Sequence, residues 1–382
     1  MRAISSSFQS LFHSEGGTGA ARLVVRCGVA ALTLAAALPG PAWGVGIGVD
    51  GPGPGGEAWL SYEYAPRLTV ADDPALHEVA PGGTYDGVGR LVVEWSGGTR
   101  VGCSGALMPG GRHVLTAAHC LTDGSGALVA TGGTVRFEGD AGTYDIALSA
   151  FYVHPGWSGV ALAGDDVALV ELAAPAPDEI TRYGLYTGSD EIGQVGTILG
   201  YGVSGTGATG EDPAAYPFGT KRAGLNVYDM LADDLLEAFG LVPGIDFQPG
   251  AMLAYDFDSG DPANDAFGHF FGLDDTGLGD DEALSASGDS GGPVLIGGLV
   301  AGITSYGLRV EDLSGYSTDV NGALDSSFGE IGVDMRVSYY ADFIYAVLGA
   351  PPSSGGSVPA PAPLALLGAG LAAGALARRR RA

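Results

Sequence analysis

The chain is poor in positive charge. It holds 17 lysine and arginine residues against 44 aspartate and glutamate residues, a formal net charge of −27 at pH 7. Lys221 is its only lysine. So acidic a surface repels nucleic acids and anionic membranes, favours solubility and suits a salty habitat in which counterions screen self-repulsion. The composition therefore excludes a nucleic-acid-binding role.

Cysteine is also scarce, with three residues in 382. Cys27 falls in the leading segment interpreted below as a signal, which leaves Cys103 and Cys120 on either side of His119. In an exported protein this even pair can form a disulfide, with two buried free thiols as the alternative. The histidines lack metal-ligand spacing, so the sequence predicts no catalytic metal and no other cofactor.

The first 44 residues have the pattern of a secretory signal. Arg22 and Arg26 precede an apolar stretch over 29–38, and small residues follow around Ala42. A buried helix is the alternative. Residues 45–80 are Gly/Pro-rich at first, and we interpret them as an N-terminal extension or propeptide.

The other end, residues 350–382, combines a flexible linker with a short apolar run and a cluster of arginines. The run over 364–377 is shorter than the roughly 20 residues that a membrane span needs. This order resembles the PEP-CTERM sorting tail of Gram-negative bacteria. The resemblance implies a secreted or cell-envelope protein, removal of the tail by an exosortase-type enzyme, and membrane contact only through the tail before processing. A permanent weak anchor is the alternative.

Residues 81–349 consist mainly of short apolar runs between glycine-rich turns, which predicts an all-β fold. Two stretches have helical spacing instead, over 228–239 and 339–348. The second is expected to be a C-terminal helix packed on the β structure.

Three segments carry the residue types of nucleophilic catalysis, in the order His, Asp, Ser. They are Leu115–Cys120, Asp165–Val170 and Gly288–Pro293. A Gly-Asp-Ser-Gly-Gly run taken alone is also typical of a surface turn. A serine hydroxyl needs an imidazole to accept its proton, and the imidazole needs a carboxylate to orient it. The segments therefore predict a serine hydrolase site.

With further segments in the same order, the region from about 85 to 349 resembles the trypsin/chymotrypsin family of serine proteases. These segments are Cys103–Leu107, His154–Trp157, Gly200–Gly202, Ile303–Gly307 and Gly332–Ile344. The resemblance implies two six-stranded antiparallel β-barrels, with Ser290 as nucleophile, His119 as general acid/base and Asp166 as the orienting carboxylate. It also implies an oxyanion hole at Gly288 and Ser290, and a disulfide between Cys103 and Cys120. Asp165 is expected to be a solvated neighbour.

The same resemblance places the substrate pocket. Its floor would be Leu284, and its other lining residues would be Ser305, Tyr306, Gly307 and Gly332. A leucine floor predicts a preference for an apolar or aromatic residue on the acyl side of the cut. A shifted loop that brings in an acidic side chain from 280–282 is the alternative.

Activation in this family uses a new amino terminus, which pairs with the aspartate before the nucleophile, here Asp289. Val79 is the candidate terminus, and another partner for Asp289 is the alternative. An acidic stretch over 256–265 can hold structural Ca²⁺, with a plain solvated loop as the alternative.

The sequence thus predicts a secreted serine endopeptidase that acts on protein or peptide substrates. The rivals are a non-catalytic envelope protein that keeps the protease fold for binding, and an esterase that uses the same triad.

Overall fold

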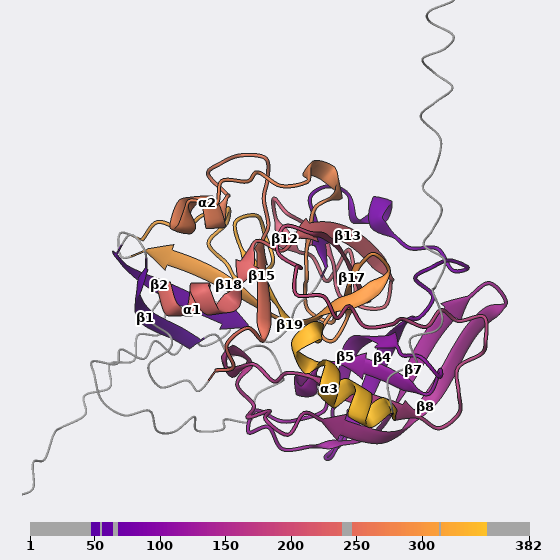
Figure 1. The fold of residues 1–382 in the computed structure, drawn as a ribbon. Coiled ribbons are helices and arrows are strands. Elements are labelled where there is room, and N and C mark those ends of the chain that lie inside the picture. Colours follow the sequence, from indigo (N-terminus) through magenta and orange to yellow (C-terminus); the bar gives the residue numbers. More distant parts are fainter. Residues whose placement is uncertain (1–46, 54–55, 64–67, 239–246, 313–314, 350–382) are drawn as a thin grey trace, which may run out of the picture.

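The computed structural model describes residues 47–349, except 54–55, 64–67, 239–246 and 313–314 (Figure 1). The predicted signal over 1–44 and the predicted sorting tail from 350 onward lie outside the described residues. Among the residues described, no helix is both long and apolar enough to cross a membrane.

The first half of the fold is a closed antiparallel barrel of six strands in the order β4-β5-β6-β9-β8-β7. Its strands are β4 (Val88–Trp95), β5 (Arg100–Leu107), β6 (His113–Thr116), β7 (Ala130–Gly139), β8 (Gly142–Val153) and β9 (Ala168–Leu172). Apolar residues alternate with more exposed ones along β4, as expected for a strand with one face in a core. Closure leaves no unpaired strand edge in this half.

The second half is a larger antiparallel sheet whose main path runs β13-β10-β17-β18-β19-β15-β14. Its strands are β10 (Val195–Gly200), β13 (Arg222–Val227), β14 (Met230–Leu231), β15 (Met252–Asp256), β17 (Pro293–Ile296), β18 (Leu299–Asp312) and β19 (Ile331–Arg336). The side chain of Asn226 in β13 donates to the carbonyl of Asp256 in β15 at 2.7 Å, so β13 and β15 approach each other. The all-β prediction and one of the two predicted six-stranded antiparallel barrels are confirmed. In place of the second six-stranded barrel, the described residues form a nine-stranded antiparallel sheet.

The N-terminal extension contributes strands to the second half. The hairpin of β1 (Ile47–Gly53) and β2 (Gly56–Glu63) adds to the edge of β18. The short strand β3 (Thr69–Val70) lies in a small separate sheet with β11 (Gly205–Thr206), β12 (Gly210–Glu211) and β16 (Ala283–Leu284). The body of the protein thus starts well before the predicted boundary at residue 81.

Helices are few and short in the part of the chain that the structure describes. They are α1 (Ala232–Ala238), α2 (Ala266–Phe271) and α3 (Val337–Leu348), with 3-10 turns η1 (Pro74–His77), η2 (Ala118–Cys120), η3 (Ala161–Ala163) and η4 (Gly279–Asp281). The predicted C-terminal helix is confirmed as α3. The stretch predicted to be helical over 228–239 starts as β14 and becomes helical only at Ala232, and its last residue lies outside the described part. Helix α2 was not predicted from the sequence.

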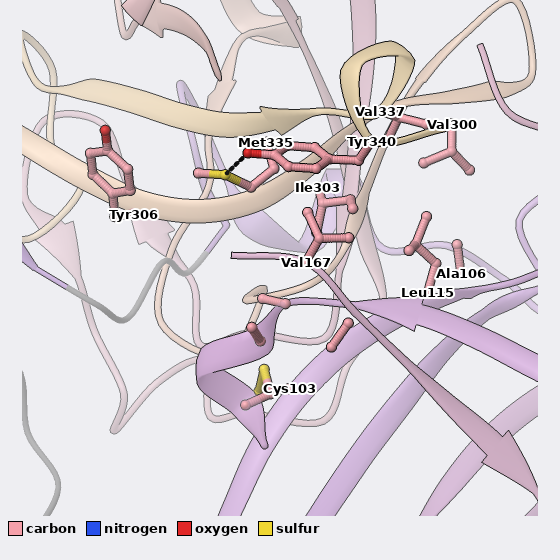
Figure 2. Close-up of a cluster of buried hydrophobic side chains, with 14 of the residues drawn as sticks. Cys103, Ala106, Leu115, Val167, Val300, Ile303, Tyr306, Met335, Val337 and Tyr340 are labelled. Atoms are coloured by element: carbon pink, nitrogen blue, oxygen red, sulfur yellow. Dashed lines mark hydrogen bonds between the residues drawn. A yellow bond between two sulfur atoms is a disulfide. The ribbon is translucent and has the colours of Figure 1, made fainter. Parts of the chain in front are cut away.

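One apolar core joins the two halves. Ala106 and Leu115 of the barrel and Val300 and Ile303 of β18 belong to this cluster, with Val167 among them (Figure 2). Burying an aliphatic side chain of this size stabilises the fold by about 1.5–3 kcal/mol. The position of Val167, directly after Asp166, fixes the backbone of that aspartate between the halves.

Candidate active site

His119 and Asp166 meet at the end of two paired strands. Strand β6 leads to His119 and β9 starts just after Asp166, and the antiparallel ladder sets Thr116 opposite Ala168. Asp166 Oδ1 accepts a hydrogen bond from the backbone N–H of His119 at 2.8 Å. The second oxygen, Oδ2, lies 2.7 Å from His119 Nδ1. The carboxylate thus fixes both the backbone and the ring of the histidine.

A third donor reaches Asp166 from the other half of the molecule. Ser305 Oγ donates to Asp166 Oδ2 at 2.6 Å. The register of β18 against β19 shifts between Thr304 and Tyr306, and such a bulge re-aims the side chain of the extra residue. Asp166 itself is 0% exposed, so these donors take the place of the hydrogen bonds that water would provide. Ser305 was predicted to line the substrate pocket, and its hydrogen bond to the carboxylate was not predicted.

The prediction that Asp165 is solvated is wrong. The residue is 6% exposed, and its Oδ1 lies 3.2 Å from His154 Nδ1. Its backbone N–H donates to the hydroxyl of Tyr340 in α3 at 2.7 Å. Burial raises the pKa of the Asp165 carboxyl, and burial lowers the pKa of His154. The C-terminal helix therefore packs against the segment that carries Asp166.

Ser290 lies in the tight turn between β16 and β17. Its carbonyl accepts a hydrogen bond from the N–H of Ser104 at 2.9 Å. A Cβ atom on the next residue, Gly291, would lie only 2.0 Å from the hydroxyl oxygen of Thr116 and 2.6 Å from the nitrogen of Ala117. Only a glycine permits this approach. The turn that carries the serine is thus in contact with the chain that leads to His119.

Ser104 fixes the orientation of the same turn through its side chain. Its hydroxyl donates to the carbonyl of Gly288 at 3.0 Å and accepts from the N–H of Tyr201 at 2.9 Å. Gly288 adopts a φ of +97°, which favours glycine. Within the described part of the chain, the N–H groups of Gly288 and Ser290 donate to no protein acceptor. Both groups therefore remain available to a ligand.

The predicted disulfide between Cys103 and Cys120 is confirmed, with an S–S distance of 2.02 Å. Both cysteines are buried, and they join the strand that carries Ser104 to the turn that carries His119. The sulfur of Cys120 lies 3.7 Å from the carbonyl oxygen of Ser290. The covalent bond therefore lies directly behind the segments of the histidine and the serine.

Replacing both Cys103 and Cys120 by Ala should lower the free energy of unfolding by about 3 kcal/mol, because the bond closes a loop with a sequence separation of 17. Urea unfolding of the variant and of the wild type measures this difference. Addition of a reductant should leave the variant unchanged and move the wild type toward it. A variant as stable as the oxidised wild type would contradict the assigned role of the bond.

The predicted pocket residues lie together only in part. Leu284 is fully buried in a core cluster with Tyr255. The side chain of Tyr306 lies in the other core cluster (Figure 2). Its hydroxyl is 3.6 Å from Met252 Sδ. Gly307 pairs with Gly332 between β18 and β19.

Tyr255, which was not predicted to be part of the site, fills the space beside Gly332. A Cβ atom on Gly332 would lie 2.4 Å from the ring of Tyr255. The Tyr255 hydroxyl forms a hydrogen bond of 3.1 Å with Ser285 Oγ. No sequence motif marks this tyrosine, because its neighbours come from strands far along the chain. An aromatic ring therefore lies directly against Gly332, one of the residues predicted to line the substrate pocket.

Asp289 has partners in the uncut chain. Its carboxylate accepts hydrogen bonds from the N–H of Gly202 at 2.8 Å and from the N–H of Ala286 at 3.2 Å. The candidate terminus Val79 uses its own N–H in a hydrogen bond to the carbonyl of Lys221 at 2.9 Å. The turn around Ser290 is thus held without a new amino group next to Asp289.

Part of the chain is similar to proteins of a known family. A family model described as Trypsin matches residues 84–215, a region that contains His119 and Asp166 and ends before Ser290. Among solved structures, that of HL collagenase is similar at 21% sequence identity and a TM-score of 0.48, over 72% of this chain and 97% of that chain. Over residues 84–215 the chain is therefore similar to the trypsin family.

Proposed function

We propose that the protein is an exported serine endopeptidase in which Ser290, His119 and Asp166 form the catalytic triad. The observation that carries the proposal is the fully buried Asp166 carboxylate, which accepts hydrogen bonds from His119 and Ser305. A buried carboxylate in contact with Nδ1 leaves the other ring nitrogen of the histidine to act as base. Replacing a buried charged group and its partners by apolar side chains is often neutral or stabilising, so the presence of this carboxylate favours a functional role.

In the proposed mechanism, His119 takes the proton of the Ser290 hydroxyl as the oxygen attacks a peptide carbonyl. Asp166 keeps the ring in the correct tautomer and stabilises the imidazolium that forms. The N–H groups of Gly288 and Ser290 stabilise the developing oxyanion, and each such donor typically contributes 10²–10³-fold in rate. His119 then gives the proton to the leaving amine, and water hydrolyses the acyl-enzyme by the same steps in reverse.

The proposed substrate preference is an apolar residue on the acyl side of the cut. Leu284 offers no charge to select a basic side chain, and the ring of Tyr255 beside Gly332 limits the available depth. Together these two features favour a small apolar residue over an aromatic one. Glu282, part of the alternative acidic loop, instead accepts a hydrogen bond from the N–H of Asp258.

The proposal includes export of the protein and removal of its C-terminal tail. The disulfide suits an oxidising compartment, in agreement with a protein that is secreted or held in the cell envelope of a Gram-negative bacterium. An exosortase-type enzyme would remove the tail beyond residue 350. The substrates of the exported protease would then be extracellular or envelope proteins.

Labelling with a fluorophosphonate tests the proposal. The purified protein should gain one adduct on Ser290 by intact mass, and the Ser290→Ala variant should gain none. Because Asp289 is already hydrogen-bonded in the uncut chain, we expect labelling without prior proteolytic nicking.

Other labelling results would indicate a zymogen or a different function. Labelling only after nicking would show that the uncut chain is a zymogen. Absence of labelling from the folded protein in every form would contradict the proposal and favour a binding protein. Turnover of esters without turnover of peptides would favour the esterase.

A further inference from the structure

Three aspartates outside the proposed active site converge on one point. Asp256 ends β15, Asp258 follows two residues later, and Asp265 is the N-cap of α2, which lies away from the first barrel (Figure 1). Each offers one carboxylate oxygen, and these oxygens lie within 4.8 Å of one another. Two oxygens that bind the same Ca²⁺ at about 2.4 Å can be no more than about 4.8 Å apart. The spacing therefore fits a single calcium ion.

The burial of the cluster separates it from an ordinary acidic surface loop. Asp256, Asp258 and Asp265 are between 3% and 5% exposed. Asp258 Oδ1 is buried and accepts no hydrogen bond from the described residues. A buried carboxylate oxygen without a partner costs free energy. It therefore indicates a ligand that supplies the missing interaction.

The surroundings add negative charge and no compensating cation. In the described part of the protein, no lysine, arginine or histidine forms an ion pair with any of the three aspartates. Glu282 lies close by, because its Oε1 accepts from the N–H of Asp258 at 2.8 Å. Four carboxyl groups therefore lie close together in a buried environment, where like charges repel strongly. A bound divalent cation would offset this repulsion.

The remaining carboxylate contacts fix the geometry. Asp256 Oδ2 accepts from the N–H of Phe267 at 2.8 Å, and the two oxygens of Asp265 accept from the N–H groups of Gly268 and Asp275. These bonds restrain the side chains while leaving lone pairs for a cation.

Two other residues of the acidic stretch lie outside the cluster. Asp261 is exposed and accepts from the N–H of Ala263, and the side chain of Asn264 is bonded to Thr318 and Ser259.

We propose that Asp256, Asp258 and Asp265 bind one Ca²⁺ ion, with water or backbone carbonyls completing its coordination. The ion would join the end of β15 to the start of α2. Through Glu282 it would also reach the segment that leads to Leu284. The site is separate from the proposed triad and does not depend on its activity.

Isothermal titration of the chelator-treated full-length protein with CaCl2 tests the proposal. The wild type should bind one Ca²⁺ with a Kd on the order of 10⁻⁴ M or tighter. At about a hundredfold excess of Ca²⁺ over Kd, the Tm should rise by about 5 °C. Mg²⁺ should bind more weakly, because it demands shorter, near-octahedral contacts that these restrained carboxylates do not provide.

Two variants complete the experiment. Asp258→Asn should lose the Ca²⁺-dependent rise in Tm and weaken binding at least about tenfold, a typical cost of removing a charged ligand interaction. Its Tm without calcium should be no lower than that of the wild type, because one repulsive charge is gone. Asp280→Asn, a change at an exposed aspartate of the same region, should behave as the wild type.

Three results would overturn the proposal. One is the absence of both heat and a Tm shift in the wild type at millimolar Ca²⁺. Another is a set of many weak sites that Asp258→Asn leaves unchanged, which would indicate counterion binding by the acidic surface. The third is an equal loss of binding in the Asp258→Asn and Asp280→Asn variants.

Discussion

Replacing Asp166 by Asn should lower kcat about 10⁴-fold while the protein stays folded, as expected for loss of the carboxylate that sets the histidine tautomer. An amide at this position presents an N–H to His119 Nδ1 or to Ser305 Oγ, both of which now donate to Asp166. The ring would then keep its proton on the nitrogen that must accept one from Ser290. Peptide hydrolysis and the rate of fluorophosphonate labelling measure the effect.

The neighbouring residue provides a matched control. Asp165→Asn removes the same charge one position earlier, and asparagine tolerates the φ of +63° found there. Because Asp165 faces His154 and Tyr340, its replacement should leave kcat nearly unchanged. Equal losses in the two variants would contradict the assignment of Asp166 as the orienting carboxylate.

Replacing Tyr255 by Ala should change the substrate preference. Removal of the ring opens space beside Gly332, in the core cluster that also contains Leu284. Substrates with an aromatic residue on the acyl side of the cut should therefore be hydrolysed more efficiently. The ratio of kcat/KM for an aromatic over a small residue should rise about 10–200-fold, the range for a change of hydrophobic fit in a pocket. A series of peptides that differ only at this residue measures the ratio.

Stability has to be followed in the same experiment, because truncation of a buried aromatic side chain costs about 3–5 kcal/mol. Tyr255→Phe keeps the ring and loses only the hydrogen bond to Ser285, so its preference should match the wild type. A folded Tyr255→Ala variant with an unchanged preference would show that this ring does not limit the pocket.

The parts of the site that are formed within short segments of the chain could be predicted from the sequence. The histidine and the orienting aspartate are adjacent to paired strands, and the serine lies in a glycine-rich turn that can adopt few conformations. The strands were predictable because short apolar runs bounded by glycines leave few other folds. The C-terminal helix was predictable from its apolar face.

The features that were not predicted correctly depend on contacts between segments that are far apart in the sequence. The burial of Asp165 depends on Tyr340, which lies 175 residues away. The role of Ser305 depends on a strand bulge that no composition signals. The segment around β3 has no strong apolar run, yet it finds partners in β11 and β16. Tertiary pairing in these cases overrides the local preference.

The acidic stretch over 256–265 could be predicted only in part from the sequence. The sequence shows many side-chain oxygens between residues 256 and 265 but does not indicate which of them converge on one point. The fold brings Asp256, Asp258 and Asp265 together and leaves Asp261 exposed. Glu282 joins them from the other side through the N–H of Asp258. Which carboxylates converge is thus a property of the turn that leads from β15 into α2.

Mass spectrometry of an unbiased peptide mixture, incubated with the purified wild type or with Ser290→Ala, tests the central claim most directly. The wild type should cut peptide bonds, mostly after small apolar residues, and the variant should cut none. Peptides left intact by a folded wild type, or cut equally by both proteins, would contradict a serine endopeptidase that acts through Ser290.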